Sequence, residues 1–133
     1  MHSYDKLSTY NDFKSAFIVE PYVLNMIDFK KRSLVANFRC SGHRLEVEVG
    51  RYDNIDRRER FCKLCTTSQV EDEFHFLAVC SRYSILRQKY LPSLYCRPTY
   101  DNFIFHMQKR DLTNYIANFI SHAMNVRRRV LDQ

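Results

Sequence analysis

Apolar side chains recur at helical spacing in several parts of the chain. From Tyr22 to about Arg39 they recur at helical spacing, and lysines and an arginine at residues 30–32 interrupt the stripe. The longest stripe follows Asp111, and three consecutive arginines lie near its carboxyl end, where cations interact favourably with the helix dipole. This periodicity predicts helices over residues 22–39, 82–91 and 112–130, and a short one over 102–109 capped by Asp101.

The segment from Leu45 to Val49 alternates apolar and acidic residues instead, and Gly50 follows it. Alternation with period two predicts a strand within residues 44–49, although no second segment is an obvious pairing partner. The chain has two glycines and three prolines, and so few turn residues favour long helices over a many-stranded sandwich. The expected fold class is therefore mainly α, a compact helical domain with at most one short strand or hairpin.

The length of 133 residues fits one domain, and the chain contains no repeat, low-complexity tract or linker. Residues 1–20 are mixed and polar, so we expect a partly ordered arm with a short helix near 12–19, followed by a single domain over 21–133. The N-terminus lacks the pattern of a secretory leader, and no stretch approaches the roughly 18 apolar residues of a membrane span. We therefore expect an intracellular protein, nuclear or cytoplasmic, with no membrane partner.

Four residues, Cys62, Cys65, His75 and Cys80, have the spacing C-x2-C-x9-H-x4-C. The two-residue gap lets a tight turn direct both sulfurs at one point, and the His-x4-Cys pair reaches that point from a second element. Three thiolates and one imidazole fill a tetrahedral shell around zinc and leave no position for water. Soft thiolates also favour zinc over magnesium or calcium. The spacing therefore predicts one structural Zn²⁺ per chain, with the helical domain built around this CCHC knuckle.

The second ligand pair places a condition on the local backbone. The acidic run at residues 71–73 starts the helix that carries His75, where the helix dipole is positive. In an unbroken α-helix, side chains five residues apart point about 140° apart, so His75 and Cys80 could not share a metal. We therefore expect a distortion or a helix end at Cys80, with Ser81 capping a new helix.

The cysteines also admit other readings. Free cysteine is often a small buried apolar residue, and a disulfide would need an oxidising compartment that nothing in the sequence supports. Cys40 and Cys96 have no partner at metal-site spacing, so we interpret both as reduced thiols.

The region around the knuckle is similar to a known type of sequence. The spacing R-x3-C-x2-C-x9-H-x4-C, with acids before the histidine, resembles the zinc-binding region after the reverse transcriptase domain of non-LTR retrotransposons. Residues 43–52 (HRLEVEVGRY) and 83–92 look like the flanking segments of retroelement-derived open reading frames. The match covers roughly residues 21–130 and is strongest from 38 to 92, although Ser81 stands where many members have proline.

This resemblance implies zinc ligation by the four residues of the knuckle and a role in holding nucleic acid near a polymerase. The chain carries no polymerase carboxylate motif and no endonuclease motif. If it comes from a retroelement, it is therefore only the C-terminal piece of the polyprotein.

A nucleic-acid-binding zinc module is the first functional reading. The formal net charge is +6, and three thiolates with one Zn²⁺ add −1, which leaves about +5 and permits binding to a phosphate backbone. Acidic residues are interleaved with the lysines and arginines around the knuckle, so this pattern of charges would also suit a solvated surface. Tyr52 and Tyr83 could stack on unpaired bases or pack in the core. The predicted contacts to RNA or DNA are Arg57, Arg58, Arg60, Lys63, Arg82 and Arg87.

Three other readings stay open. The zinc could stabilise a surface that binds protein, for example a reverse transcriptase domain, or the chain could be a relic fragment without its own activity. An enzyme is not expected, because a filled Cys3His shell opposes metal-assisted hydrolysis. Nothing in the sequence fixes His43, His106 or His122 in a catalytic geometry.

Overall fold

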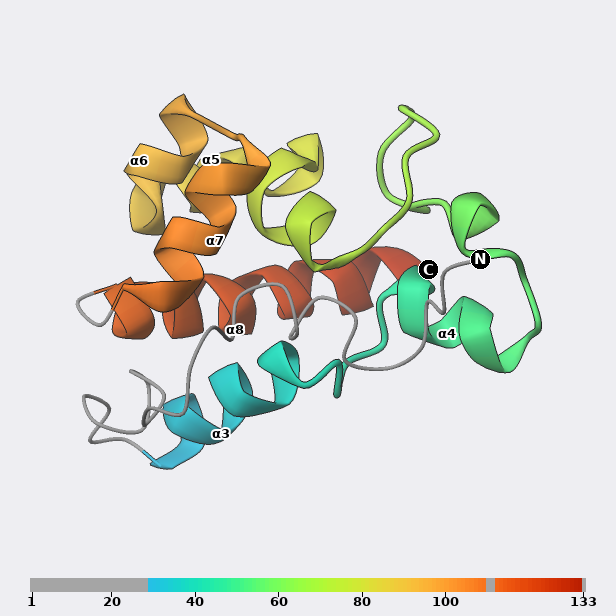
Figure 1. Ribbon diagram of the computed structural model, residues 1–133, viewed down its shortest axis with the longest axis horizontal. Coiled ribbons are helices and arrows are strands. Elements are labelled where there is room, and N and C mark those ends of the chain that lie inside the picture. Colours follow the sequence, from blue (N-terminus) through green and yellow to red (C-terminus); the bar gives the residue numbers. More distant parts are fainter. Residues whose placement is uncertain (1–28, 110–111, 133) are drawn as a thin grey trace.

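The structure is a computed structural model that describes residues 29–109 and 112–132 (Figure 1). Its helices are α3 (Phe29–Arg39), α4 (Glu46–Tyr52), α5 (Ser84–Tyr90), α6 (Pro92–Cys96), α7 (Tyr100–Gln108) and α8 (Thr113–Leu131). There are also 3-10 turns at Arg57–Glu59 and Ser81–Tyr83 and a π-helix at His75–Val79. These ranges contain no strand, and an isolated bridge joins Phe61 to Val70. The predicted mainly α, compact helical fold is therefore confirmed.

Helix α8 is the element on which much of the described chain packs. Figure 1 shows it running through the middle of the molecule, with α3 on one side and α5 to α7 on the other. It packs directly against α3 and α5. Its inward face is apolar and buried at Ile116, Phe119, Ile120 and Ala123. The helix predicted over residues 112–130 is thus confirmed within one residue at each end.

Four aromatic side chains from separate parts of the chain meet in the core. The ring of Phe76 in the π-helix lies 5.8 Å from Phe38 of α3, 5.0 Å from Tyr83 and 5.8 Å from Phe119 of α8, measured between centroids. All four are almost completely buried, and burying one such side chain contributes about 1.5–3 kcal/mol. Because Phe76 directly follows His75, this packing also fixes the segment that carries His75.

The strand predicted within residues 44–49 is wrong, because this segment leads into helix α4. Residues 45–48 are all buried, so acidic and apolar positions do not alternate between solvent and core. The backbone N–H of Glu46 donates to the Glu71 carboxylate at 2.8 Å, and that of Val47 donates to the Glu71 carbonyl at 3.1 Å. Glu71 therefore satisfies N–H groups that the first turn of a helix leaves without partners.

Several predicted boundaries also differ from the structure. Residues 22–28 of the first predicted helix, and the N-terminal arm with its helix near 12–19, lie outside the described residues. Thr99 rather than Asp101 caps α7, because its hydroxyl accepts a hydrogen bond from the N–H of Asn102 at 3.2 Å. Ser81 lies within a 3-10 turn whose start has no side-chain cap. The helix predicted over 82–91 is present as that turn followed by α5.

Candidate metal centre

The structure brings Cys62, Cys65, His75 and Cys80 together as the sequence spacing predicts. Their ligand atoms all lie within 4.8 Å of one another. Sγ of Cys62 is 3.9 Å from Sγ of Cys80, and Sγ of Cys65 is 3.4 Å from Nε2 of His75. Bond lengths of about 2.3 Å to sulfur and 2.0–2.1 Å to nitrogen in a tetrahedron put such atoms about 3.8 Å and 3.5 Å apart. The four side chains could therefore hold one metal ion.

The first ligand pair lies on a loop that closes on itself. The N–H of Cys62 donates to the carbonyl of Gln69 at 2.8 Å, next to the bridge between Phe61 and Val70. Within the loop, the N–H of Leu64 points at Sγ of Cys62 at 3.4 Å. A backbone donor of this kind stabilises a thiolate and holds the sulfur in place.

The second ligand pair depends on the π-helix. The N–H of Cys80 donates to the carbonyl of His75 at 2.8 Å, which closes a turn one residue wider than in an α-helix. This wide turn brings residues five apart to the same side, and the chain leaves the helix at Cys80 with φ −59° and ψ 124°. The predicted distortion at Cys80 is therefore confirmed.

The surroundings of the cluster favour the thiolate form of Cys62 and Cys65 and the thiol form of Cys80. A hydrogen bond from the Cys80 thiol lowers the pKa of Cys62, and the same bond raises the pKa of Cys80, so the two sulfurs share one proton. Partial burial opposes ionisation of Cys65, but hydrogen bonds from the hydroxyl and N–H of Thr67 lower its pKa overall. A divalent cation would take the place of the shared proton and bind all three sulfurs, since the thiolate is the form that ligates metal.

Burial and the neighbouring sulfurs act in opposite directions on His75. Burial alone would lower its pKa, but the hydrogen bond and the negative charge of Cys62 raise the pKa overall. The backbone that carries the imidazole is fixed at this point, because the carboxylate of Asp72 accepts a hydrogen bond from the backbone N–H of His75 at 2.8 Å. With three sulfurs and one nitrogen, a tetrahedral ion would have no open position for a substrate, as in structural sites.

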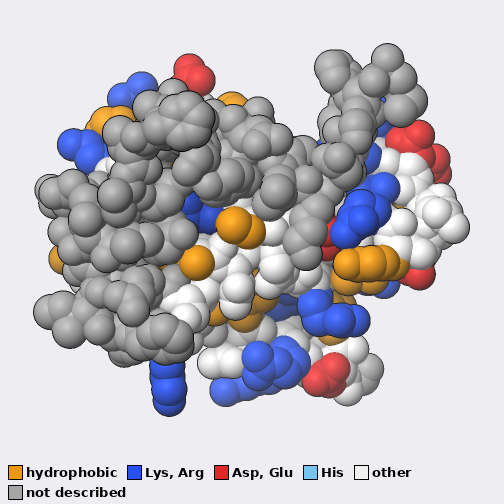
Figure 2. All heavy atoms as spheres, turned by 60° about the horizontal axis from the view of Figure 1, so that its bottom comes forward, with side chains coloured by type: hydrophobic (Ala, Val, Ile, Leu, Met, Phe, Trp, Pro, Cys, Tyr) orange, Lys and Arg blue, Asp and Glu red, His pale blue; other side chains and the backbone are white. Residues whose placement is uncertain are grey.

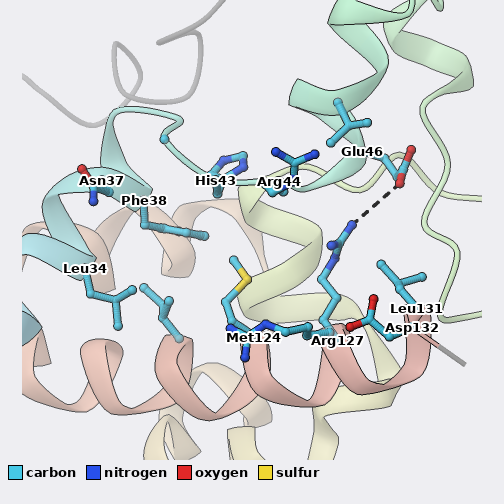
Figure 3. A pocket seen from close by; sticks show the side chains of 14 residues that line it. Leu34, Asn37, Phe38, His43, Arg44, Glu46, Met124, Arg127, Leu131 and Asp132 are labelled. Atoms are coloured by element: carbon cyan, nitrogen blue, oxygen red, sulfur yellow. Dashed lines mark ion pairs between the residues drawn. The ribbon is translucent and has the colours of Figure 1, made fainter.

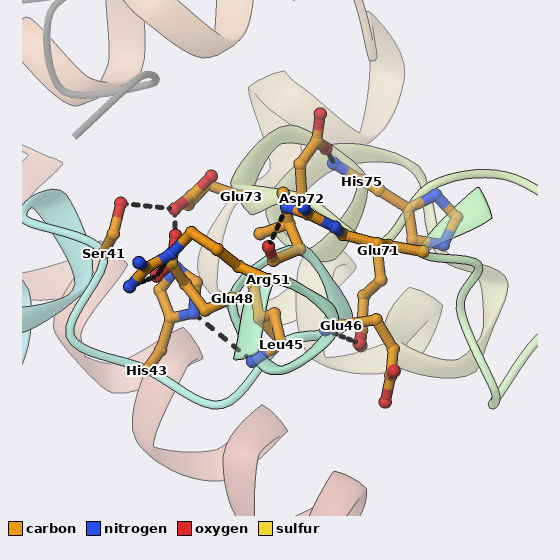
Figure 4. Close-up of polar contacts among 12 residues, drawn as sticks. Ser41, His43, Leu45, Glu46, Glu48, Arg51, Glu71, Asp72, Glu73 and His75 are labelled. Atoms are coloured by element: carbon orange, nitrogen blue, oxygen red, sulfur yellow. Dashed lines mark hydrogen bonds and ion pairs between the residues drawn. The ribbon is translucent and has the colours of Figure 1, made fainter. Parts of the chain in front are cut away.

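The three acids at residues 71–73 differ in their contacts, and the carboxylate of Asp72 accepts a hydrogen bond from the N–H of His75 in the first turn of the helix. Glu71 is fully buried, and its carboxylate receives two hydrogen bonds from Arg127 of α8 at 2.9 and 2.8 Å. Glu73 lies 2.6 Å from Nε2 of His43 and accepts a hydrogen bond from the Ser41 hydroxyl at 3.2 Å (Figure 4). Glu71 and Glu73 therefore tie the metal-binding segment to α8 and to the turn after α3.

Two of the six predicted nucleic-acid contacts are corrected, because their side chains are buried. Arg60 is 8% exposed and donates to the carbonyls of Ile55 and Val47 at 2.8 and 2.7 Å. Arg87 is 2% exposed and donates to the carbonyl of Leu77 at 2.7 Å, and burial lowers its pKa to about 10. Neither guanidinium is open to a phosphate, so both are structural residues.

The other four predicted cations lie nearer the surface. Arg57 is 3.5 Å from Asp72, and the largely exposed Lys63 is 3.5 Å from Glu46. Arg58, whose side chain is 89% exposed, lies 3.7 Å from Asp56, and Arg82 is exposed as well. In the view of Figure 2, basic side chains gather on the right and lower parts of the face, beside single hydrophobic side chains.

The aromatic residues near the knuckle also divide into buried and exposed side chains. Tyr83 is 1% exposed and belongs to the core, so it cannot stack on a base. Tyr52 is 72% exposed, and the guanidinium of Arg51 lies 4.6 Å from the centre of its ring. Phe61, next to Cys62, is 44% exposed and was not singled out by the sequence pattern. The one feature of the sequence that could have drawn attention to Phe61 is its position next to Cys62.

The histidines considered for catalysis are engaged in other contacts. His43 binds Glu73 through Nε2, and its Nδ1 lies 3.3 Å from the N–H of Leu45. His106 is buried with Nδ1 2.8 Å from the carbonyl of Asn102. His122 is stacked on Tyr90 at a centroid distance of 5.4 Å. These contacts give the enzyme reading no support.

Comparison with family models, with curated proteins and with solved structures finds no match for this chain. Among the helices that the structure describes, none combines the length and the apolar character that crossing a bilayer requires. The function is therefore inferred from the chain's own residues and their geometry.

Proposed function

We propose that this chain is a zinc-binding module that binds nucleic acid without catalysing a reaction, and that it derives from the region after a non-LTR reverse transcriptase. The observation that carries the proposal is the cluster of Cys62, Cys65, His75 and Cys80, whose ligand atoms lie within 4.8 Å of one another. The other elements of the proposal rest on the charges around this cluster and on the sequence resemblance.

Zinc is the metal that best suits the cluster. Three sulfurs and one imidazole nitrogen are the donors of structural zinc sites, whereas magnesium and calcium take oxygen ligands. Iron–sulfur clusters are mostly held by four cysteines, and the ligand set here contains only three. The proposed cofactor is therefore one structural Zn²⁺ per chain.

Exposed cations and aromatic rings around the metal loop support binding to nucleic acid. Arg58, Lys63 and Arg82 lie within four residues of a metal ligand in the sequence and are exposed. Tyr52 and Phe61 expose aromatic rings in the same part of the chain. Cations that contact phosphates and aromatic side chains that stack on bases are the usual means of binding single strands without sequence preference. Single-stranded RNA or DNA is therefore the proposed partner.

The test has two parts, metal content and binding. Elemental analysis of protein purified without added metal should give close to one zinc per chain, and the change Cys62→Ser should remove it while Cys96→Ser does not. Fluorescence anisotropy with labelled oligouridine and oligothymidine should then show binding that weakens as salt rises.

The triple change of Arg58, Lys63 and Arg82 to alanine should lower the salt slope by about 2 units, because each phosphate contact on a single strand contributes roughly 0.7. A control triple of Arg97, Lys109 and Arg129 to alanine removes the same charge from exposed positions and should leave the slope nearly unchanged. Equal losses in both triples, or no binding of the wild type at low salt, would favour a zinc-stabilised protein-interaction module instead.

A further inference from the structure

A cavity of about 510 Å³ lies between α3, the segment that leads into α4, and α8 (Figure 3). None of the four metal ligands lines it. The volume is within the range of about 300–1,000 Å³ that ligand sites occupy in proteins. The cavity is therefore a second candidate site, separate from the metal cluster.

We call this cavity the groove. Its floor is apolar and is formed by side chains of two helices. Leu34 and Phe38 contribute from α3, and Ile120, Met124 and Leu131 contribute from α8. At 1.5 Å per residue, the stretch from Ile120 to Leu131 is about 16 Å long, which equals roughly three helical turns. The floor therefore suits a short amphipathic segment rather than a single small group.

Most of the polar groups in the groove are already satisfied. Arg127 is bound to the buried carboxylate of Glu71, and His43 is bound to Glu73. Glu46 lies 3.7 Å from Arg127 and 3.5 Å from Lys63. None of these groups is left to bind a charged partner.

Two arginines in the groove differ from the rest. Arg44, on the loop side, and Arg128, on α8, are exposed, and within residues 29–109 and 112–132 neither has an acidic partner. The guanidinium of Arg128 donates a hydrogen bond to the side-chain oxygen of Asn125 at 3.1 Å. Asp132 is the remaining acid in the lining. The groove thus combines an apolar floor with two guanidinium groups that no acidic side chain of residues 29–109 or 112–132 pairs with.

We propose that the groove binds an acidic amphipathic peptide segment of a partner protein. Its apolar side chains lie on the floor where Leu34, Met124 and Leu131 are at least partly exposed, as when an amphipathic helix binds in a hydrophobic groove. Its carboxylates meet Arg44 and Arg128, because guanidinium and carboxylate groups form paired hydrogen bonds. A nucleic acid would leave the apolar floor uncovered, and a basic peptide would meet two unneutralised arginines.

The site lies beyond the proposed nucleic-acid function and does not depend on it. Arg58, Lys63 and Arg82, which carry the proposed phosphate contacts, do not line the groove, although Lys63 lies 3.5 Å from Glu46, which does. Loss of either function should therefore leave the other intact.

The experiment uses the full chain and a fluorescein-labelled peptide of about twelve residues, long enough for three helical turns. The probe carries leucine at helical spacing and glutamate elsewhere, and a second probe has lysine in place of every glutamate. Anisotropy should show binding of the glutamate probe and much weaker binding of the lysine probe.

Arg44→Glu and Arg128→Glu should each weaken binding of the glutamate probe by about tenfold or more, because each places a like charge against a carboxylate. The matched control is Arg129→Glu, which makes the same change in net charge at an exposed position outside the groove and should alter the affinity by less than about twofold. Circular dichroism checks that each variant is folded, and Arg128→Gln provides a milder change with a smaller loss.

Three outcomes would overturn the proposal. One is no binding of the glutamate probe by the wild type, and another is an equal loss of affinity in Arg128→Glu and Arg129→Glu. The third is displacement of the probe by oligouridine that depends on Arg44 and Arg128, which would make the groove a nucleic-acid site. Amide chemical-shift changes centred on residues 34–38 and 120–131 would confirm the location.

Discussion

At the scale of single residues, Gly50 allows α4 to pack against the segment that precedes the metal loop. A Cβ at this position would lie 2.6 Å from Cγ and 2.9 Å from Cδ of Arg60. The Arg60 side chain cannot easily move, because its guanidinium donates to two backbone carbonyls. The glycine is therefore required by the close approach of a buried arginine.

We predict that Gly50→Ala destabilises the protein by about 1–3 kcal/mol, the usual cost of overpacking a core. Helix propensity alone would favour alanine by about 1 kcal/mol, so the sign of the effect distinguishes packing from propensity. Urea unfolding measures the change, and the same substitution in an Arg60→Ala background should be neutral or stabilising. An increase in stability on Gly50→Ala in the otherwise wild-type chain would contradict the close packing.

At the scale of elements, the ion pair between Glu71 and Arg127 joins the metal-binding segment to α8. Both side chains are buried, and the carboxylate accepts three hydrogen bonds, two from Arg127 and one from the N–H of Glu46. The two residues are 56 positions apart in the sequence. A buried pair of this kind fixes which surfaces meet, and breaking it leaves an uncompensated charge.

We predict that Arg127→Leu destabilises the protein by about 3–5 kcal/mol, because Glu71 is left buried without its cation. The control Arg129→Leu, on an exposed face of the same helix, should change stability by less than about 0.5 kcal/mol. Chemical unfolding of both variants is the measurement. The double change Glu71→Gln with Arg127→Leu should recover part of the loss, and no recovery would show that the side chain of Arg127 acts through packing alone.

At the scale of the whole molecule, the candidate metal cluster lies at the border of the helical core. The loop that carries Cys62 and Cys65 is closed by its own hydrogen bonds, and Leu64 within it joins the buried hydrophobic cluster. Helices α3 and α8 pack against each other at some distance from it in the sequence. Metal loss should therefore affect residues 61–80 more than α8.

We predict that Cys65→Ser, or removal of zinc by a chelator, lowers the melting temperature and abolishes amide protection in residues 61–80 first. Structural zinc can contribute about 10–16 kcal/mol of apparent binding free energy in small peptides, but here the helical core makes the dependence partial. Hydrogen exchange and circular dichroism measure the effect, with Cys96→Ser as the control. Because metal binding requires deprotonated thiols, acidification should release the ion and give the same pattern. A melt unchanged by chelator would contradict the prediction.

The local sequence determined the class of fold, the long helix near 112–130 and the four residues of the candidate metal cluster. Hydrophobic period and ligand spacing are short-range properties, and the need for a distortion at Cys80 follows from helix geometry alone. The candidate site could thus be predicted, although the π-helix that solves the geometry could not.

Only the tertiary structure decided which charged side chains face solvent. Arg60, Arg87 and Glu71 look like surface residues in the sequence, yet all three are buried because distant segments supply their partners. The same effect turned the alternating segment at 44–49 into a helix, since Glu71 satisfies its first N–H groups. Burial of a charge is decided by the free-energy balance between desolvation and pairing, and that balance depends on contacts between residues far apart in the chain.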